Sequence, residues 1–244
     1  MISLDKLRAD IKEVTDDYEG FLYEIDVTTF AEDNRFSKQK PIPDRPPETP
    51  PKSVLVMSMF SYVGGDYFYS HEIVPRIYEH LNKKYNAEGI WFQDDGYVFD
   101  RKQYAMRSGV AKLTKPSITF HHKYGLNWKL ELLFTNLEFE ESVTVEESLY
   151  DNCIGCDAPC ESNCPEGCRM NFKLLDWEKC ANVVEGRHIF MYPERVCRIC
   201  QDSCPYSEEL KLKILEDHPD CGGFMQPLSY YKDYYSLGIP AEDI

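Results

Sequence analysis

The sequence predicts an α/β fold in its N-terminal part, followed by a loop-rich module that contains the cysteines. Two observations support this prediction. Between residues 50 and 140, segments of strand length alternate with segments of helical periodicity, which is typical of an α/β layer. From residue 153 onward, cysteines recur at short intervals in two runs, where we expect loops and short helices. We therefore predict one domain over residues 1–145 and a second over residues 146–244.

Four segments before residue 86 have clear patterns. Residues 3–19 carry apolar side chains at helical spacing with charges between them, which predicts an amphipathic helix. Residues 41–51 hold six of the fifteen prolines, so we expect an extended connection there. Residues 53–60 are a continuous apolar run, typical of a strand that is buried on both faces. Residues 71–85 predict a second helix, whose apolar side carries Ile73, Ile77 and Leu81.

Shorter elements follow before the cysteines. Residues 89–93 predict a strand, and Asp100 is placed to cap a short helix that runs through Arg107 and ends at Gly109. Residues 117–120 and 126–135 predict two strands, which we expect to form a hairpin through residues 121–125.

Two histidines, His121 and His122, fall in the loop of that hairpin. We expect them to be polar surface rather than metal ligands, because a loop histidine usually is. Near the end of the chain, residues 207–217 predict a helix with Ser207 as its cap.

Composition limits the classes of function. The hydrophobic content is 43% and the aromatic content 14%, as in a folded globular protein. No apolar run approaches the length that crosses a bilayer. Ten cysteines without a secretory leader predict a reducing, oxygen-poor cytoplasm. The net charge of −15 disfavours a nucleic acid partner, because an acidic surface repels phosphates.

The cysteines are the strongest functional signal. The first run ends in Cys-Pro, and so does the second. Such paired runs are typical of two cubane iron–sulfur clusters, because short gaps let one turn of backbone direct several thiolates at one cluster. The residues of the two runs are Cys153, Cys156, Cys160 and Cys164, and then Cys197, Cys200 and Cys204.

Two alternative roles for the cysteines remain. A structural zinc site needs only four ligands, and the two Cys-x-x-Cys pairs could supply them. Zinc would leave Cys160, Cys164 and Cys204 without a role. A disulfide framework suits small secreted chains, and this sequence shows no signal peptide.

The sequence resembles the superfamily of epoxyqueuosine reductases and reductive dehalogenases. In the cysteine part, the family's lone cysteine after a Leu-Asp pair is matched by Cys180, which follows Leu175-Asp176. Upstream, the family's spacing is matched by Asp95, Ala105, Arg107, Gly109, Lys115 and Tyr124-Gly125, so that the resemblance covers roughly residues 50–206. It implies a nitroreductase-like α/β domain with a corrinoid site, followed by a two-cluster module like bacterial ferredoxins.

The resemblance also implies roles for residues. One cluster would be held by Cys153, Cys156, Cys160 and Cys204, and the other by Cys164, Cys180, Cys197 and Cys200. The two remaining cysteines, Cys168 and Cys221, would be buried or incidental thiols.

In the α/β domain the resemblance assigns Asp95 as the proton donor, with Tyr124 donating a proton or stacking on a ring. Arg107 and Lys115 would hold the tail of a corrinoid, and Gly109 would allow close approach of the ring. The alternatives are a solvated turn at Asp95, an exposed helix face for the two cations, and aromatic packing for Tyr124.

The sequence departs from the family at two places. The gap between the second and third cysteines is three residues, Asp157-Ala158-Pro159, where the family has two. The family's glycine-rich turn is reduced to residues 109–115, where only Gly109 is a glycine.

The function we expect is reductive chemistry on a small molecule, with electrons passing through two [4Fe–4S] clusters to cobalamin or another corrinoid. Reduced ferredoxin or flavodoxin is the expected electron donor. The alternative is an electron-transfer or corrinoid-reducing protein that acts on a separate corrinoid protein and has no substrate of its own.

Overall fold

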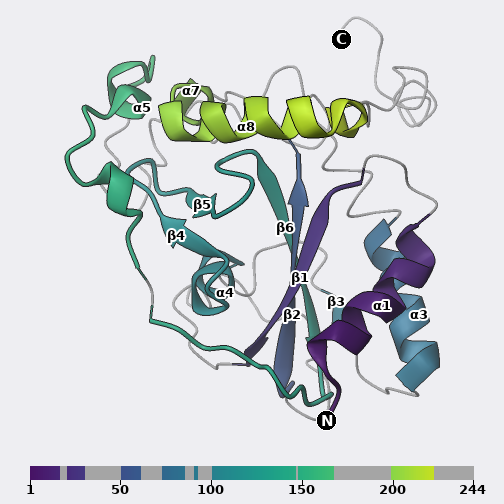
Figure 1. Ribbon diagram of the computed structural model, residues 1–244. Coiled ribbons are helices and arrows are strands. Elements are labelled where there is room, and N and C mark those ends of the chain that lie inside the picture. The colour runs from purple at the N-terminus through teal and green to yellow at the C-terminus, as the bar shows by residue number, and fades with distance from the viewer. Residues whose placement is uncertain are drawn as a thin grey trace, which may run out of the picture.

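The computed structural model of the protein describes residues 1–16, 21–30, 51–61, 73–85, 91–92, 101–146, 148–167 and 199–222. A four-stranded antiparallel sheet lies at its centre, with the strands in the order β1-β2-β6-β3 (Figure 1). These strands are β1 (Tyr23–Thr29), β2 (Ser53–Phe60), β6 (Trp128–Thr135) and β3 (Trp91–Phe92). A separate two-stranded sheet consists of β4 (Ala111–Leu113) and β5 (Thr119–His121).

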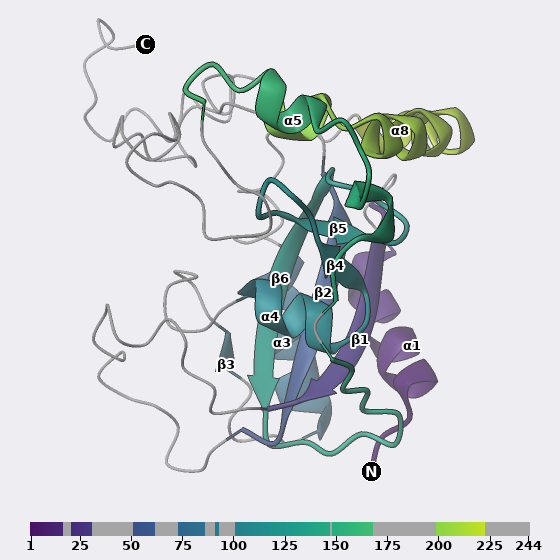
Figure 2. The same ribbon diagram turned by 90° about the vertical axis from the view of Figure 1, so that its left-hand side faces the viewer.

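Helices cover both faces of the central sheet and one of its ends (Figures 1 and 2). One face packs against α1 (Leu4–Thr15) and α3 (Val74–Tyr85), and the other against α4 (Arg101–Arg107). Across one end lies α8 (Pro205–Asp217), beside the short helices α5 (Pro159–Ser162) and α7 (Ile199–Asp202). This arrangement confirms the prediction of a mixed α/β fold.

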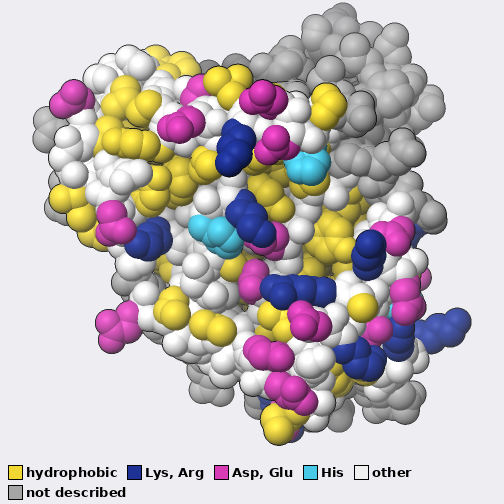
Figure 3. All heavy atoms as spheres, in the orientation of Figure 1, with side chains coloured by type: hydrophobic (Ala, Val, Ile, Leu, Met, Phe, Trp, Pro, Cys, Tyr) yellow, Lys and Arg dark blue, Asp and Glu magenta, His cyan; other side chains and the backbone are white. Residues whose placement is uncertain are grey.

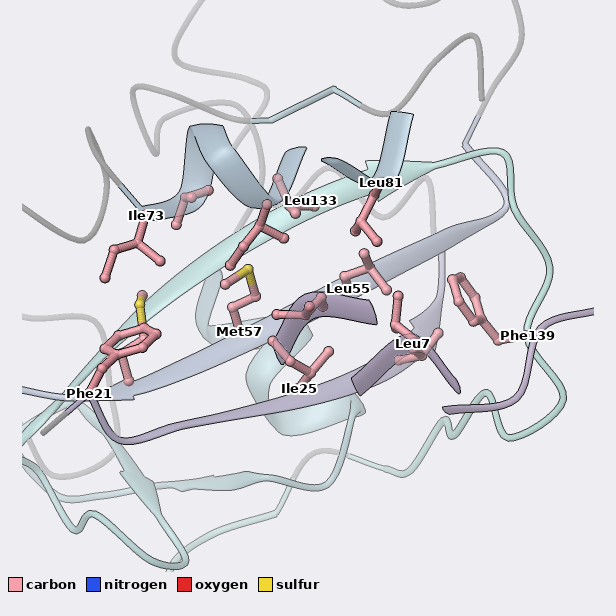
Figure 4. Close-up of a cluster of buried hydrophobic side chains, with 14 residues drawn as sticks. Leu7, Phe21, Ile25, Leu55, Met57, Ile73, Leu81, Leu133 and Phe139 are labelled. Atoms are coloured by element: carbon pink, nitrogen blue, oxygen red, sulfur yellow. The ribbon is translucent and has the colours of Figure 1, made fainter. Parts of the chain in front are cut away.

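The central strand β2 is buried along its whole length, as predicted for residues 53–60. Because successive side chains of a strand point to opposite faces, Leu55 and Met57 pack beneath α1 and α3. Val54 and Val56 pack on the opposite face beneath α4. Figure 4 shows the larger of the two cores, in which Leu7 of α1 meets the sheet. A helix layer on each face therefore explains why the strand has no polar alternation.

The two longer N-terminal helices confirm the periodicity of the sequence. The hydroxyl of Ser3 accepts a hydrogen bond from the backbone N–H of Lys6 (3.3 Å) and caps α1, which then ends at Thr15. The helix is thus shorter than the predicted residues 3–19. In α3 the predicted side chains Ile77 and Leu81 are fully buried.

The short helix α4 also lies where the sequence predicts it. It ends at Arg107, and Gly109 follows with a φ of +81° and donates its N–H to the carbonyl of Met106 (2.9 Å). A glycine adopts this left-handed conformation without the cost of a side chain. The predicted cap, Asp100, and the proline-rich residues 41–50 lie outside the described residues.

The prediction of a hairpin between residues 117–120 and 126–135 was wrong. β5 pairs with β4, whereas β6 pairs with β2 on one side and β3 on the other. β2 pairs with β6 along its whole length, and β3 pairs with Leu133 and Phe134 on the other edge. His121 ends a strand and is fully buried, contrary to the expected surface loop, whereas the side chain of His122 is 52% exposed.

Among the described residues, no helix has both the length and the apolar character that crossing a bilayer requires.

A buried ion pair joins α1 to α3. The carboxylate of Asp10, which is 5% exposed, lies 3.0 Å from the Lys6 ammonium and 2.8 Å from that of Lys84. Burial raises the pKa of Asp10, but hydrogen bonds from Lys84, Tyr85 and Lys6 outweigh it and lower the pKa to about 2.

We expect Asp10→Asn to lower the free energy of unfolding by about 2 kcal/mol at pH 7. The carboxylate stabilises the fold above its ordinary pKa of 3.8, and this contribution is lost as the pH falls toward about 2. The difference between the variant and the wild type in urea unfolding should therefore narrow below pH 3.8. Asp16→Asn is the control, since Asp16 pairs with Lys12 at 3.9 Å on the surface, and a pH-independent difference for Asp10→Asn would contradict the prediction.

Candidate metal centre

Four cysteines from distant parts of the chain line one pocket. Three come from the loop after β6 and the fourth from the start of α8, and these are the four that the resemblance groups around one cluster. The cysteines are Cys153, Cys156, Cys160 and Cys204, and the other lining residues are Thr114, Lys115, Pro116, Leu126, Pro159, Pro205 and Tyr206.

Tight turns direct the first three thiols toward one point. A 3-10 helix, η2 (Asp151–Cys153), ends at the first cysteine. Gly155 then adopts a φ of +93°, and the N–H of Cys156 returns to the carbonyl of Cys153 (3.4 Å). Pro159 opens α5 and places Cys160 at its second position. The loop is therefore folded around its own sulfur atoms.

The extra residue in the second gap is accommodated by the backbone. Ala158 has a φ of 54° and a ψ of 55°, a left-handed conformation that costs a residue with a side chain roughly 1 kcal/mol. This turn reverses the chain directly before α5. The three-residue gap is thus compatible with a common pocket for the cysteines on either side of it.

Cys204 reaches the pocket from a later segment of the chain. It is the residue before α8, and the backbone N–H groups of Ser207 and Tyr206 point toward its sulfur. Burial raises the pKa of the Cys204 thiol, and these N–H groups partly oppose that rise. The helix start therefore offers two donors to a sulfur that carries negative charge.

Ser207 anchors α8 to the α/β domain. Its hydroxyl oxygen accepts hydrogen bonds from the backbone N–H of Leu126 (2.8 Å) and the side-chain amide of Asn127 (2.9 Å). The prediction that Ser207 caps the helix was wrong, because the cap position is taken by Cys204. Ser207 is fully buried, and it is the site residue that sequence reasoning misassigned.

The turn that receives Ser207 requires a glycine. Gly125 has a φ of +62°, and a Cβ atom there would lie 2.8 Å from the Ser207 oxygen and 2.9 Å from its Cα.

Next to Gly125, Tyr124 packs with Phe60 and Cys221 in a small core that Ile214 and Leu215 of α8 complete. Tyr124 is 5% exposed, so the described structure places it in aromatic packing, and its predicted role in proton transfer stays a prediction.

Lys115 contacts the cysteine loop. Its ammonium donates a hydrogen bond to the carbonyl of Cys156 (2.8 Å), and its backbone N–H points toward the sulfur of Cys153. This contact ties the segment after β4 to the cysteines. The predicted role of Lys115 at a corrinoid tail stays a prediction.

A metal bound in this pocket would have to displace the protons of its thiols. Burial raises the pKa of the Cys160 thiol to about 11 and also raises that of Cys153, and the neighbouring sulfurs add to both shifts. Thiols with raised pKa values become thiolates when a metal replaces their protons. Four cysteine sulfurs, with no carboxylate or imidazole lining the same pocket, fit a zinc ion or a [4Fe–4S] cluster.

The second predicted cluster is described only in part. Cys164 follows α5 and Cys200 lies in α7, and these helices are neighbours, with Asn163 donating a hydrogen bond to Ser203 (3.1 Å). Cys180 and Cys197 lie outside the described residues, and so does the predicted proton donor Asp95.

Gly109 and Lys115, two of the predicted corrinoid residues, line different cavities among the described residues. Gly109 lines a cleft of about 380 Å³ between β4 and α8, and Tyr206 lines both this cleft and the cysteine pocket that Lys115 lines. The carbonyl of Arg107 accepts the N–H of Val145 (2.8 Å), and the Nε atom of Arg107 is buried without a hydrogen-bond partner among the described residues. Where the family has its glycine-rich turn, residues 111–113 form β4 and pair with β5.

Comparison with known proteins shows which fold this is. No family model and no curated protein sequence matches the chain. Among solved structures, an epoxyqueuosine reductase with an epoxyqueuosine-modified tRNA stem loop matches with a TM-score of 0.61 and 17% identity over 84% of this chain and 66% of its own. The enzyme from Bacillus subtilis matches with a TM-score of 0.57 and 19% identity, over the same shares of the two chains.

A reductive dehalogenase, whose structure suggests a mechanism for B12-dependent dehalogenation, matches with a TM-score of 0.54 and 15% identity. The chain has the fold of epoxyqueuosine reductases and reductive dehalogenases. The match with the dehalogenase covers 83% of this chain but only 33% of that dehalogenase. The predicted superfamily fold is thereby confirmed, and the chain spans 66% of the length of the reductases it matches.

We expect Ser207→Ala to loosen the contact between α8 and the α/β domain. Two buried donors would lose their acceptor, which costs about 1–3 kcal/mol in the free energy of unfolding. Urea unfolding measures this loss. The control is Ser162→Ala, whose hydroxyl makes an exposed 3.4 Å contact with the Pro159 carbonyl, and equal stability losses in the two variants would contradict the anchoring role.

Proposed function

We propose that this chain is an iron–sulfur oxidoreductase that holds two [4Fe–4S] clusters and reduces a small molecule through a corrinoid. The observation that carries the proposal is the convergence of Cys153, Cys156, Cys160 and Cys204 on one pocket. The shared fold supports it, because structures with this fold include a reductase and a B12-dependent dehalogenase.

The proposed ligands follow from the same grouping. The first cluster would be held by the four cysteines of the pocket. The second would be held by Cys164, Cys180, Cys197 and Cys200, of which the first and last lie on neighbouring elements. When bound, such clusters supply one-electron transfer with little structural rearrangement.

The residues around the pocket would tune its redox behaviour. The N–H groups at the start of α8 and the N–H of Lys115 point toward sulfur atoms, and donors of this kind favour the more negative, reduced state. Burial of Cys153 and Cys160 limits access of water to the same sulfurs. The ammonium of Lys115, held against the Cys156 carbonyl, adds a positive charge beside them.

The corrinoid part of the proposal is supported by the fold. Within it, Asp95 would donate a proton, and Arg107, Gly109, Lys115 and Tyr124 would contact the cofactor. Among the described residues Gly109 and Lys115 line different cavities, and Asp95 lies outside those residues, so we derive no step through the corrinoid. An electron-transfer or corrinoid-reducing protein without its own substrate is the alternative, and the replacement of the glycine-rich turn by β4 favours it.

The proposed partners are a reduced ferredoxin or flavodoxin as donor, and a small molecule or a corrinoid protein as acceptor, in the cytoplasm. One structure with this fold is described with a tRNA stem loop. For this chain we propose no nucleic acid partner, because the net charge is −15 and acidic side chains alternate with basic ones on the face shown in Figure 3.

Iron content tests the cluster proposal. Protein purified without oxygen should carry about eight irons per chain, and Cys156→Ala should carry about four, because one cluster loses a ligand. Cys156 is only half-buried, so its replacement should leave the fold intact. Cys221→Ala is the control, since this cysteine packs in an apolar core and should not change the iron content. Zinc in place of iron would contradict the proposal.

Cobalamin binding distinguishes a corrinoid enzyme from an electron-transfer protein without its own substrate. If the chain is a corrinoid enzyme, cluster-loaded protein mixed with cobalamin should retain about one equivalent after gel filtration, with a changed visible spectrum. If the protein retains no cobalamin but its clusters can still be reduced, the result would contradict the corrinoid part of the proposal. It would support the alternative of an electron-transfer protein without its own substrate. Iron analysis of the same sample shows whether the clusters are assembled, so that a lack of cobalamin binding is not mistaken for a lack of clusters.

A further inference from the structure

Three polar side chains converge away from the cysteines, where the β4–β5 sheet meets the edge strand β1. The carboxylate of Glu24 on β1 lies 3.4 Å from the Nε2 atom of His121 and 3.3 Å from that of His122, measured from the same oxygen, Oε2. Neither Oε2 nor the Nε2 of His121 has a hydrogen-bond partner among the described residues. All three ligand atoms lie within 4.8 Å of one another.

The backbone determines where the ring proton of His121 lies. Its Nδ1 accepts the N–H groups of Lys123 (3.1 Å) and Tyr124 (3.3 Å), so the proton of the neutral ring is at Nε2. His121 therefore presents an N–H toward Glu24 and cannot act as a ligand through that nitrogen.

His122 has the opposite arrangement. Its Nδ1 lies 3.0 Å from the carbonyl of Val110, which can only accept, so Nδ1 carries a proton. Its Nε2 then either carries a second proton or presents a lone pair to the carboxylate of Glu24. Two lone pairs 3.3 Å apart repel each other, and a cation between them removes that repulsion.

The spacing fits a metal ion as well as a proton. Two ligands that each lie about 2.0–2.1 Å from a tetrahedral zinc ion are separated by about 3.3 Å. A histidine that ligates through Nε2 while its Nδ1–H donates to a backbone carbonyl is the usual arrangement at a zinc site. His122 has this arrangement with Val110.

We propose that Glu24 and His122 bind a divalent cation of the Zn²⁺ type, with His121 as a positioning residue behind the carboxylate. Water would complete the coordination, and the Nε2–H of His121 is directed to orient the carboxylate or a water ligand. The site is separate from the cysteine pocket, and the inference does not depend on the clusters.

The neighbouring charges set the expected affinity. The ammonium of Lys123 contacts the other oxygen of Glu24 and competes with a cation for the carboxylate. Asp26 contributes a second negative charge nearby, and Arg8 partly neutralises it at 3.4 Å. Since Lys123 is 57% exposed, it is free to move toward solvent when a metal binds. Replacing it should therefore strengthen metal binding.

Calorimetric titration with ZnCl₂ tests the proposal on the full chain, purified without oxygen and with its iron content measured beforehand. We expect one Zn²⁺ to bind, His122→Gln and Glu24→Gln to weaken binding at least about tenfold, and Lys123→Gln to strengthen it. His122 is half-exposed, so its variant should fold even if Glu24→Gln does not. Zinc should also raise the melting temperature of the wild type and not that of His122→Gln.

A second histidine–carboxylate pair provides the matched control. The Nε2 of His80 lies 3.4 Å from Glu13, which also contacts a lysine, but no second histidine joins that pair among the described residues. His80→Gln should leave zinc binding unchanged. Binding that survives in His122→Gln, or that falls equally in His80→Gln, would overturn the proposal and leave Glu24 and the two histidines as an ion-pair cluster.

Discussion

The buried contact between Ser207 and the turn at residues 125–127 is the constraint on which the candidate site depends. Three cysteines belong to the segment after the central sheet, but Cys204 directly precedes α8, and the serine hydroxyl holds the first turn of that helix against the domain. Gly125 permits this approach, since a side chain there would meet the backbone of Ser207. The Asn163–Ser203 hydrogen bond and the packing of Ile214 and Leu215 add to this contact in setting the position of Cys204.

The surroundings of the pocket bear on the proposed redox role. A metal that binds these buried thiols must displace their protons, and the amides at the start of α8 stabilise the negative charge that then develops on the Cys204 sulfur. Part of the electrostatic environment is thus supplied by backbone N–H groups, which do not depend on the identity of most side chains. This is consistent with a fold that persists at 15–20% identity to its solved relatives.

The sequence predicted the elements whose burial is simple and missed those that depend on pairing. β2 was predictable because helices cover both its faces, and the grouping of the four cysteines came from spacing and resemblance. The pairing of β5 with β4 was not, because a short apolar run does not reveal its partner strand. Edge strand β1 was not predicted at all. Ser207 was misassigned because a serine at a helix start looks the same whether it caps the helix or anchors it elsewhere.

The central claim is that sulfurs from the loop and from α8 enclose an iron–sulfur cluster rather than zinc. Mössbauer spectroscopy of protein produced on ⁵⁷Fe and purified without oxygen tests it most directly. The account predicts that cuboidal [4Fe–4S] clusters contain nearly all of the iron, with a change of state on chemical reduction. Iron in isolated tetrahedral sites, or its absence in favour of stoichiometric zinc, would contradict the account.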